Sequence, residues 1–278
     1  MHSRRPDGAN PARRAAAGGD QAARGAWAAI LAACLALAVA CAPAAPPPPV
    51  TAPGPTPAPN PPSTSSPTAT SGCAGPAPHA GDLCWQDQWW IVKASDTPIG
   101  PGPNTFASAN VSVRADGLHL TVRPRKGRWT AAELISEARF GYGTYRWTVR
   151  LPALDPNVVF GLFTWEDDPA FNHREIDFEA ARWGVAADPT NSQFVVQPYA
   201  SAGNLQRLTT PSGTQTVGFT WRPDAVAFTA GGSSWTYAGA SIPPPPASVH
   251  MNLWLDAGRP PSDGKPVDVV VSGFTYTP

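Results

Sequence analysis

Short apolar stretches dominate the sequence from residue 72 onward and limit the folds that this part of the chain can form. Such stretches cover residues 111–123, 143–152, 157–166, 175–180, 193–198, 250–256 and 267–277, with Gly, Pro, Asn and Asp between them. No long stretch with helical periodicity competes with them, and Asp116-Gly117 divides the first one as a hairpin turn would. The sequence therefore predicts one all-β domain over residues 72–278, built as a two-sheet sandwich.

The first 41 residues have the pattern of an export signal. Arginines gather before residue 25, residues 25–40 are uncharged and mostly apolar, and small residues lead to Cys41. An apolar stretch of this length is short for a membrane-spanning helix, which needs about 20 residues. Residues 37–41 resemble a bacterial lipobox, so we expect lipidation at Cys41. Cys34 is a second position that fits, and a signal cut elsewhere or left uncleaved is a further alternative.

Residues 42–71 have the composition of a linker. Twelve of these 30 positions are Pro, and none is charged or aromatic. A segment of this kind cannot bury a hydrophobic core, and its prolines extend it toward polyproline II. We expect an extracellular domain that this linker tethers to the outer face of the cell membrane through an N-terminal lipid.

The charge balance and the cysteines narrow the possible partners. The chain has 20 basic and 20 acidic residues, so it offers no basic excess for nucleic acid, and we expect none as a partner. Cys73 and Cys84 are the only cysteines after the linker. In an exported protein they are expected to form a disulfide. A metal-binding pair is the alternative, but no nearby pair of histidines completes a ligand set.

The most informative stretch is residues 173–179, where three carboxylates alternate with apolar residues. In a strand, Glu175, Asp177 and Glu179 lie on one face, and Ile176 and Phe178 lie on the other. Crowded carboxylates repel each other, which raises the pKa of at least one of them. Glycoside hydrolysis uses such a pair, one ionised and one protonated. Taken alone, the pattern also fits a solvated strand face or a calcium-binding cluster.

The sequence around these carboxylates resembles glycoside hydrolase family 16, in particular its branch of lichenases and xyloglucan-modifying enzymes. Residues 175–179 resemble the catalytic strand of that family, and residues 140–145, 163–165, 219–224 and 251–254 resemble further strands in the same order. The resemblance implies a concanavalin A-like jelly roll and a retaining mechanism. It implies that Glu175 is the nucleophile, that Glu179 is the general acid/base and that Asp177 is the partner of the nucleophile.

The resemblance also bears on residues outside the catalytic strand. It implies that Glu133 lies in a strand and contacts substrate, although residues 130–138 by themselves have a helical pattern with capping-box spacing. His173-Arg174 and Ile135 differ from the Trp-Asp and Arg that lichenases carry, which puts the identity of the substrate in question. Ser272 stands near the place where relatives often supply an Asp to a structural calcium. We therefore expect no metal, and we expect no cofactor.

Several polar and aromatic side chains are expected beside the carboxylates, because they lie on the same predicted face or close to it. The candidates for contact with sugar are Glu133, Trp165, His173, Trp183, Gln197, Asn252 and Trp254. Aromatic rings stack on the apolar faces of sugars, and the polar side chains can bind hydroxyl groups. For His173 and Gln197, an ordinary surface role is the alternative.

These features together predict an exported, lipid-anchored, monomeric, retaining endo-β-glycanase that acts on a β-linked, β-glucan-like polysaccharide. A transglycosylase on the same fold would resolve the intermediate with a sugar instead of water. A lectin-like carbohydrate-binding module is an alternative from a different class. The three carboxylates argue against it, because binding alone does not require both Glu175 and Glu179.

Overall fold

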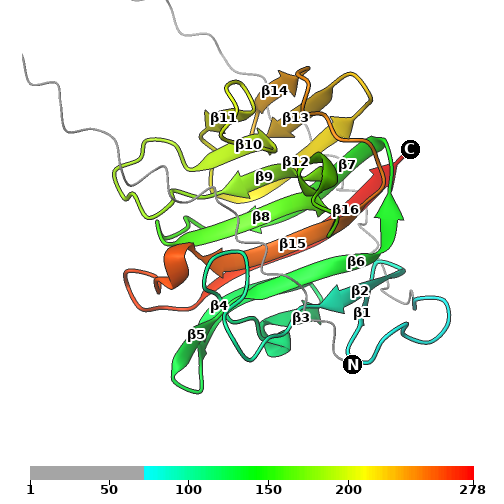
Figure 1. Cartoon of the computed structure of the whole chain (residues 1–278). Coiled ribbons are helices and arrows are strands. Elements are labelled where there is room, and N and C mark those ends of the chain that lie inside the picture. The colour runs from blue at the N-terminus through cyan, green and yellow to red at the C-terminus, as the bar shows by residue number, and fades with distance from the viewer. Residues whose placement is uncertain (1–71) are drawn as a thin grey trace, which may run out of the picture. The chain divides into compact units, whose positions relative to one another are not determined.

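The computed structural model describes residues 72–278, which form two β-sheets packed face to face (Figure 1). The all-β, two-sheet prediction for this part of the chain is confirmed. The predicted signal segment, the linker and the lipidation at Cys41 or Cys34 lie outside the described residues. Among residues 72–278, no helix is long and apolar enough to cross a membrane.

The first sheet contains the strand that carries the carboxylates. Its order is β1-β2-β6-β15-β8-β9-β10-β11, and each neighbouring pair is antiparallel. The strands are β1 (Leu83–Trp85), β2 (Gln88–Val92), β6 (Ala132–Phe140), β8 (Val158–Trp165), β9 (Ile176–Ala180), β10 (Ser192–Val196), β11 (Leu205–Leu208) and β15 (Ala247–Leu255). Figure 1 shows β9 inside this sheet, between β8 and β10.

The second sheet lies behind the first and has the order β14-β13-β12-β7-β16-β4-β3, with β5 paired to β4. Its strands are β3 (Val111–Arg114), β4 (Gly117–Arg125), β5 (Arg128–Thr130), β7 (Gly143–Leu151), β12 (Gly213–Trp221), β13 (Val226–Ala230), β14 (Ser233–Tyr237) and β16 (Val267–Thr277). Three short turns of 3-10 type, Ser108–Asn110, Ala170–Arg174 and Asp256–Gly258, complete the described elements.

The two sheets bury a common core between their inner faces. Alternation along the strands supplies it, with Leu162 and Phe178 from the first sheet and Trp147 and Phe219 from the second. Aromatic rings fill much of the space, since Tyr145 stacks on Phe219 with ring centroids 4.8 Å apart. The opposite face of the first sheet is therefore free to carry polar residues, and we call it the carboxylate face.

Two local predictions can be followed in the backbone. Residues 111–123 form the β3–β4 hairpin, in which Arg114 pairs with Gly117 across the turn. Gly117 has φ +135°, and a Cβ there would lie 2.6 Å from the carbonyl oxygen of Val271, so a larger residue would not fit. Residues 132–140 form β6, so the strand implied by the family resemblance is correct and the local helical pattern is overridden.

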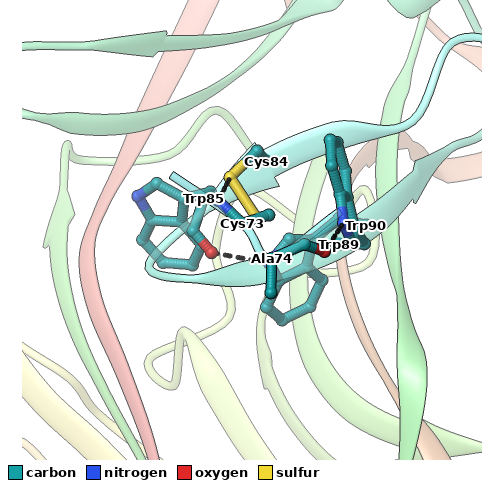
Figure 2. The surroundings of a disulfide bond; sticks show 6 residues. All are labelled: Cys73, Ala74, Cys84, Trp85, Trp89 and Trp90. Atoms are coloured by element: carbon teal, nitrogen blue, oxygen red, sulfur yellow. Dashed lines mark hydrogen bonds between the residues drawn. A yellow bond between two sulfur atoms is a disulfide. The ribbon is translucent and has the colours of Figure 1, made fainter. Parts of the chain in front are cut away.

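A disulfide fixes the start of the described domain. Cys73 and Cys84 are joined, with their Cα atoms 5.7 Å apart, and the Cys73 amide donates to Sγ of Cys84 (Figure 2). Figure 2 also shows three tryptophans around this loop; the indole of Trp90 donates to the carbonyl oxygen of Trp85 at 3.1 Å. The bond ties the first described residues to β1 at the edge of the first sheet.

Candidate active site

The strand β9 places the carboxylates of its sequence on the outer side of the first sheet. Asp177 and Glu179 lie on the carboxylate face, because Ile176 and Phe178 point into the core. Glu175 directly precedes β9, and its carbonyl accepts the amide of Gln197, which continues the pairing with the strand β10. All three predicted carboxylates are therefore on one face.

A tight turn holds the start of this strand. Phe171, Asn172, His173 and Arg174 have φ values of 54°, 51°, 60° and 54°, the left-handed region that non-glycine residues rarely occupy. The amide of Glu166 donates to the carbonyl of His173 at 2.7 Å, and the hydroxyl of Thr164 donates to that of Arg174 at 2.8 Å. Strained backbone of this kind is typical of functional sites, where surrounding contacts hold it in place.

The crowding of the carboxylates changes their acidity. Burial raises the pKa of Glu175 to about 8, and the negative charge of Glu179 adds to the effect. Burial also raises the pKa of Asp177 well above its usual range, together with the charges of Glu175 and Glu179. A hydrogen bond between Asp177 and Glu175 lowers the pKa of Glu175 and raises that of Asp177. In this pair Asp177 keeps the proton and donates a hydrogen bond to the carboxylate of Glu175.

Neutral amides complete the hydrogen bonding of the other two carboxylates. Gln197 donates to Asp177 at 3.2 Å, and Gln193 donates to Oε2 of Glu179 at 2.7 Å. The side-chain oxygen of Gln193 in turn accepts from Trp183 at 3.2 Å and from Arg207 at 3.1 Å. These contacts fix the amide orientation of Gln193, so that its NH₂ group faces Glu179.

Strand register shows which residues of the neighbouring strands lie in one row with Glu179 on the carboxylate face. Gly161 of β8 lies opposite Glu179, Asn252 of β15 lies opposite Gly161, and Glu133 of β6 lies opposite Asn252. A Cβ at Gly161 would be 2.6 Å from Oδ1 of Asn252, so a larger residue there would displace this carboxamide. The structure therefore places the predicted Asn252 in one row with Glu179 and Glu133.

Glu133 is on the predicted face, but protein groups occupy both of its oxygens. Its side chain is buried, Lys93 Nζ lies 2.8 Å from Oε2, and Nδ1 of His250 lies 3.0 Å from Oε1. Burial would raise the pKa of Glu133, but the charge of Lys93 and the hydrogen bond to His250 lower it below its usual range. Glu133 is thus bound by the protein itself, and its contact with substrate stays a prediction.

Trp165 and His173 lie together beside the start of the catalytic strand. Their rings stack with centroids 4.2 Å apart and an interplanar angle of 5°, and Nδ1 of His173 is 2.9 Å from the carbonyl oxygen of Glu166. One face of the Trp165 ring is therefore covered by His173. Burial lowers the pKa of His173, which favours its neutral form.

The structure corrects the prediction for Trp254. The residue lies on the carboxylate face, but it is only 2% exposed, inside a second apolar cluster with Phe106, Val159 and Ala181. Trp183 packs on its edge, with centroids 5.9 Å apart, and is itself partly exposed. Neighbouring residues cover Trp254 because the segment that contains Phe106 packs over this end of the sheet. The ring of Trp254 has no open face for a sugar, whereas Trp183 keeps part of its surface open.

Sequence reasoning missed several side chains that shape this site. Lys93 precedes Glu133 by 40 residues and carries no local signal, and Arg207 reaches Gln193 from the next strand. For two other side chains, alternation is the signal that could have found them. Alternation along β10 places Gln193 on the same face as Gln197, and alternation along β15 places His250 on the same face as Asn252.

One group in the described part of the chain could supply metal ligands. His79, Asp82 and Glu137 bring three ligand atoms within 4.8 Å of one another. Their contacts are already those of a hydrogen-bonded cluster, since Nδ1 of His79 lies 2.8 Å from Glu137 and the amide of His79 donates to Asp82 at 2.7 Å. None of these three residues is among the carboxylates of residues 175–179.

Comparison with known proteins adds evidence from sequence. No family model matches the chain. A β-glucanase of Acetivibrio thermocellus is 30% identical over 165 residues, which cover 57% of this chain and 46% of the relative. The chain thus spans about half the length of the curated relatives it matches.

Solved structures extend the comparison to the fold. A native glycosidic hydrolase is 26% identical, with coverage of 68% of this chain and 89% of the other and a TM-score of 0.54. A glycoside hydrolase family 16 endo-glucanase from Bacteroides ovatus is 15% identical, with coverage of 71% and 98% and a TM-score of 0.56. The chain has the fold of a family 16 glycoside hydrolase. This confirms the predicted concanavalin A-like β-sandwich for residues 72–278.

Proposed function

We propose that this protein is a retaining β-glucanase of glycoside hydrolase family 16 that cleaves a β-linked glucan within the chain. The main observation behind this proposal is that three carboxylates of residues 175–179 share one face of the sheet. The pKa values of two of them, Glu175 and Asp177, are raised. The likeness in sequence to a β-glucanase and in fold to a family 16 endo-glucanase supports the substrate class.

In the proposed mechanism, Glu175 attacks the anomeric carbon while Glu179 gives its proton to the departing glycosidic oxygen. The covalent glycosyl-enzyme forms as the glycosidic bond breaks. Water then attacks the same carbon with Glu179 as the base, and Glu175 leaves, so that the configuration is retained.

The neighbours of these carboxylates would have supporting roles in each step. Asp177 donates a hydrogen bond to Glu175, which favours the ionised nucleophile. Gln193 holds the carboxyl group of Glu179 in place. Gln197, Asn252, His173, Trp165 and Trp183 surround the carboxylates and are proposed to contact the sugar units.

A panel of polysaccharides tests this proposal. We expect the purified protein to release reducing ends from mixed-linkage β-glucan or β-1,3-glucan, and the first product to be the β-anomer by ¹H NMR. Xyloglucan, agar and carrageenan serve as comparison substrates. Transfer to added oligosaccharides in place of hydrolysis would indicate a transglycosylase. Binding without cleavage of any substrate would contradict the proposal and favour a carbohydrate-binding module.

We further propose that the protein is exported and lipidated at Cys41, because the apolar stretch before it ends in small residues. Metabolic labelling with a fatty acid should mark the wild type and a Cys34→Ser variant. The Cys41→Ser variant should lose both the label and its membrane association. Retained labelling of Cys41→Ser with loss in Cys34→Ser would move the modification to Cys34.

A further inference from the structure

A buried ionic cluster lies beside the carboxylates and has no role in the chemistry described above. It consists of Glu133 on β6, His250 on β15 and Lys93, which follows β2. The side chains of Glu133 and His250 are 3% and 9% exposed. Removing ions from water is costly unless other groups compensate them, so this arrangement needs every partner that it has.

Lys93 is held in one place by contacts on three sides. Its Nζ donates to Oε2 of Glu133 at 2.8 Å and to the carbonyl oxygen of Gly100 at 2.8 Å. It also lies 4.4 Å from the centroid of the Phe106 ring, a cation–π contact. The position of this positive charge is therefore fixed by the segment that follows β2 and packs over the sheet.

The cluster is linked to the carboxylates by register and by charge. Glu133 lies in the same row as Glu179, with Asn252 and Gly161 between them. Burial and the charge of Glu179 are the main causes that raise the pKa of Glu175, and the negative charge of Glu133 adds to them. His250 lies opposite Phe163, and Phe163 lies opposite Asp177, the hydrogen-bond partner of Glu175. Charges this close to a buried carboxyl group change its ionisation.

The other charged groups near Glu175 cannot replace Lys93. Asp177 and Glu179 are acidic, and His250 is bound to Glu133. Arg174 directs its guanidinium to the carbonyl oxygen of Pro244 at 3.1 Å and toward Asp168 at 3.5 Å. Arg139 is paired with Glu166, and Arg207 binds Asp188 and Gln193. Lys93 is thus the cation that pairs with Glu133.

We propose that Lys93 is a positioning residue that acts through Glu133: it balances the charge of Glu133 and thereby allows Glu175 to ionise beside Asp177 and Glu179. Its meaning for catalysis rests on the proposed function, whereas the coupling of charges can be measured without any substrate. Lys93 itself contacts Glu133, Gly100 and Phe106, so its effect on Glu175 passes through Glu133.

The small number of glutamates allows a direct test. The chain contains five Glu, namely Glu133, Glu137, Glu166, Glu175 and Glu179. In protein labelled with ¹³C at the glutamate carboxyl group, NMR should show five signals, which single substitutions to Gln assign. The midpoint of the Glu175 titration is then followed in the wild type and in variants.

We expect Lys93→Met to raise the Glu175 midpoint by about half a pH unit or more, because Glu133 is left uncompensated. The double variant Lys93→Met/Glu133→Gln should restore it, since the pair is then removed without a change in net charge. Lys93→Arg should keep the wild-type midpoint. Lys265→Met is the matched control, because this lysine is exposed and paired with Asp263 at the surface.

Loss of folding in Lys93→Met would not end the test. Glu133→Gln alone leaves the charge of Lys93 in excess and should lower the Glu175 midpoint. An unchanged Glu175 midpoint in both single variants overturns the proposal. So does proton uptake by Glu133 in Lys93→Met, with Glu175 unmoved.

Activity separates this proposal from the proposed function. In an active wild type, the acid limb of the pH profile for kcat/KM should move with the Glu175 midpoint in each variant. If the wild type is active and Lys93→Met moves neither the acid limb of the pH profile nor the Glu175 midpoint, the role of Lys93 is contradicted. An inactive wild type whose midpoints still shift as expected contradicts the glucanase function and leaves the charge coupling established.

Discussion

On the outer face of the second sheet, Asp116 and Asp268 enclose His119, while on the carboxylate face of the first sheet Glu175, Asp177 and Glu179 adjoin one another. The ring of His119 is within 2.8 Å of Asp116 and within 2.7 Å of Asp268, and Arg150 also binds Asp116 at 2.7 Å. The hydrogen bond to His119 is the main cause that lowers the pKa of Asp116 to about 2. On β9, burial instead raises the pKa of Glu175 to about 8.

The difference shows how the same residue type serves structure in one place and chemistry in another. Asp116 meets the guanidinium of Arg150 and the ring of His119, so its ionisation stabilises the fold. The carboxylates of β9 meet one another and the neutral amides of Gln193 and Gln197, so ionisation works against the fold. A site kept in this state against folding stability is typical of catalysis.

The largest expected effect separates the two clusters by activity. Glu175→Ala and Glu179→Ala should each lower kcat by roughly 10³-fold or more, because each removes a group that reacts with the sugar. Asp116→Asn should keep kcat near the wild-type value. Assays on mixed-linkage β-glucan measure these rates.

Azide distinguishes the two roles. It should rescue Glu179→Ala with substrates that have good leaving groups and give a β-glycosyl azide, since the intermediate still forms. In Glu175→Ala the azide should attack directly and give the α-product. The opposite pair of products would exchange the two roles, and wild-type rates in both variants would remove the catalytic assignment of β9.

Ionisation of Glu175 should lower the stability of the fold, whereas ionisation of Asp116 should raise it. The pKa of folded Glu175 lies above its ordinary value of 4.5, so its ionisation costs stability as pH rises from about 4.5 to about 8. Glu175→Gln should therefore increase the free energy of unfolding by about 4 kcal/mol at pH 8 and by little at pH 4. Urea unfolding at both pH values measures this. A variant less stable than the wild type at pH 8 would contradict the account of crowded, buried charge.

A smaller effect is expected for the amide that holds Glu179. Gln193→Leu removes a hydrogen bond to a charged group, which should lower kcat roughly tenfold with little change in KM. Gln206→Leu on the neighbouring strand is the matched control, because Gln206 is exposed and bonds to the backbone of Arg207. Equal kcat values in the two variants would show that Gln193 has no role in positioning the acid.

The smallest effect concerns the paired cluster itself. His119→Gln removes the imidazole ring that binds both Asp116 and Asp268 and should lower Tm at pH 7 by about 2–4 °C. The stabilisation from Asp116 is present above its ordinary pKa of 3.8 and is lost as pH falls through about 2. Calorimetry should therefore find the difference reduced near pH 2. A difference that does not depend on pH would point to packing instead of charge.

The sequence predicted the strands that carry the site because their signal is local. Alternation over residues 175–179 places all three acids on one face in any sandwich, and the same rule placed Asn252 with His250 on β15. The edge strands β1 and β14 were missed, since β1 has only three residues and β14 contains three Ser and Thr residues among its five. The local helical pattern of residues 130–138 indicated the wrong element, because pairing with neighbouring strands overrides local propensity.

Alternation along a single strand cannot predict contacts between segments that are far apart in sequence. The prediction that Trp254 stacks on a sugar was correct about its face and wrong about its exposure, because residues near Phe106 fold over the sheet and cover it. The partners of Glu133 likewise come from two other segments, and neither is near it in sequence.

The sequence by itself determined which acids share a face, since side chains alternate with a period of two along any strand. It also determined that residues 72–278 form a sandwich, because apolar residues recur at that period. The tertiary structure decided which of these charges are balanced. That depends on strand register and on the segment after β2, which bring Lys93 to Glu133 and leave Glu175, Asp177 and Glu179 with one another.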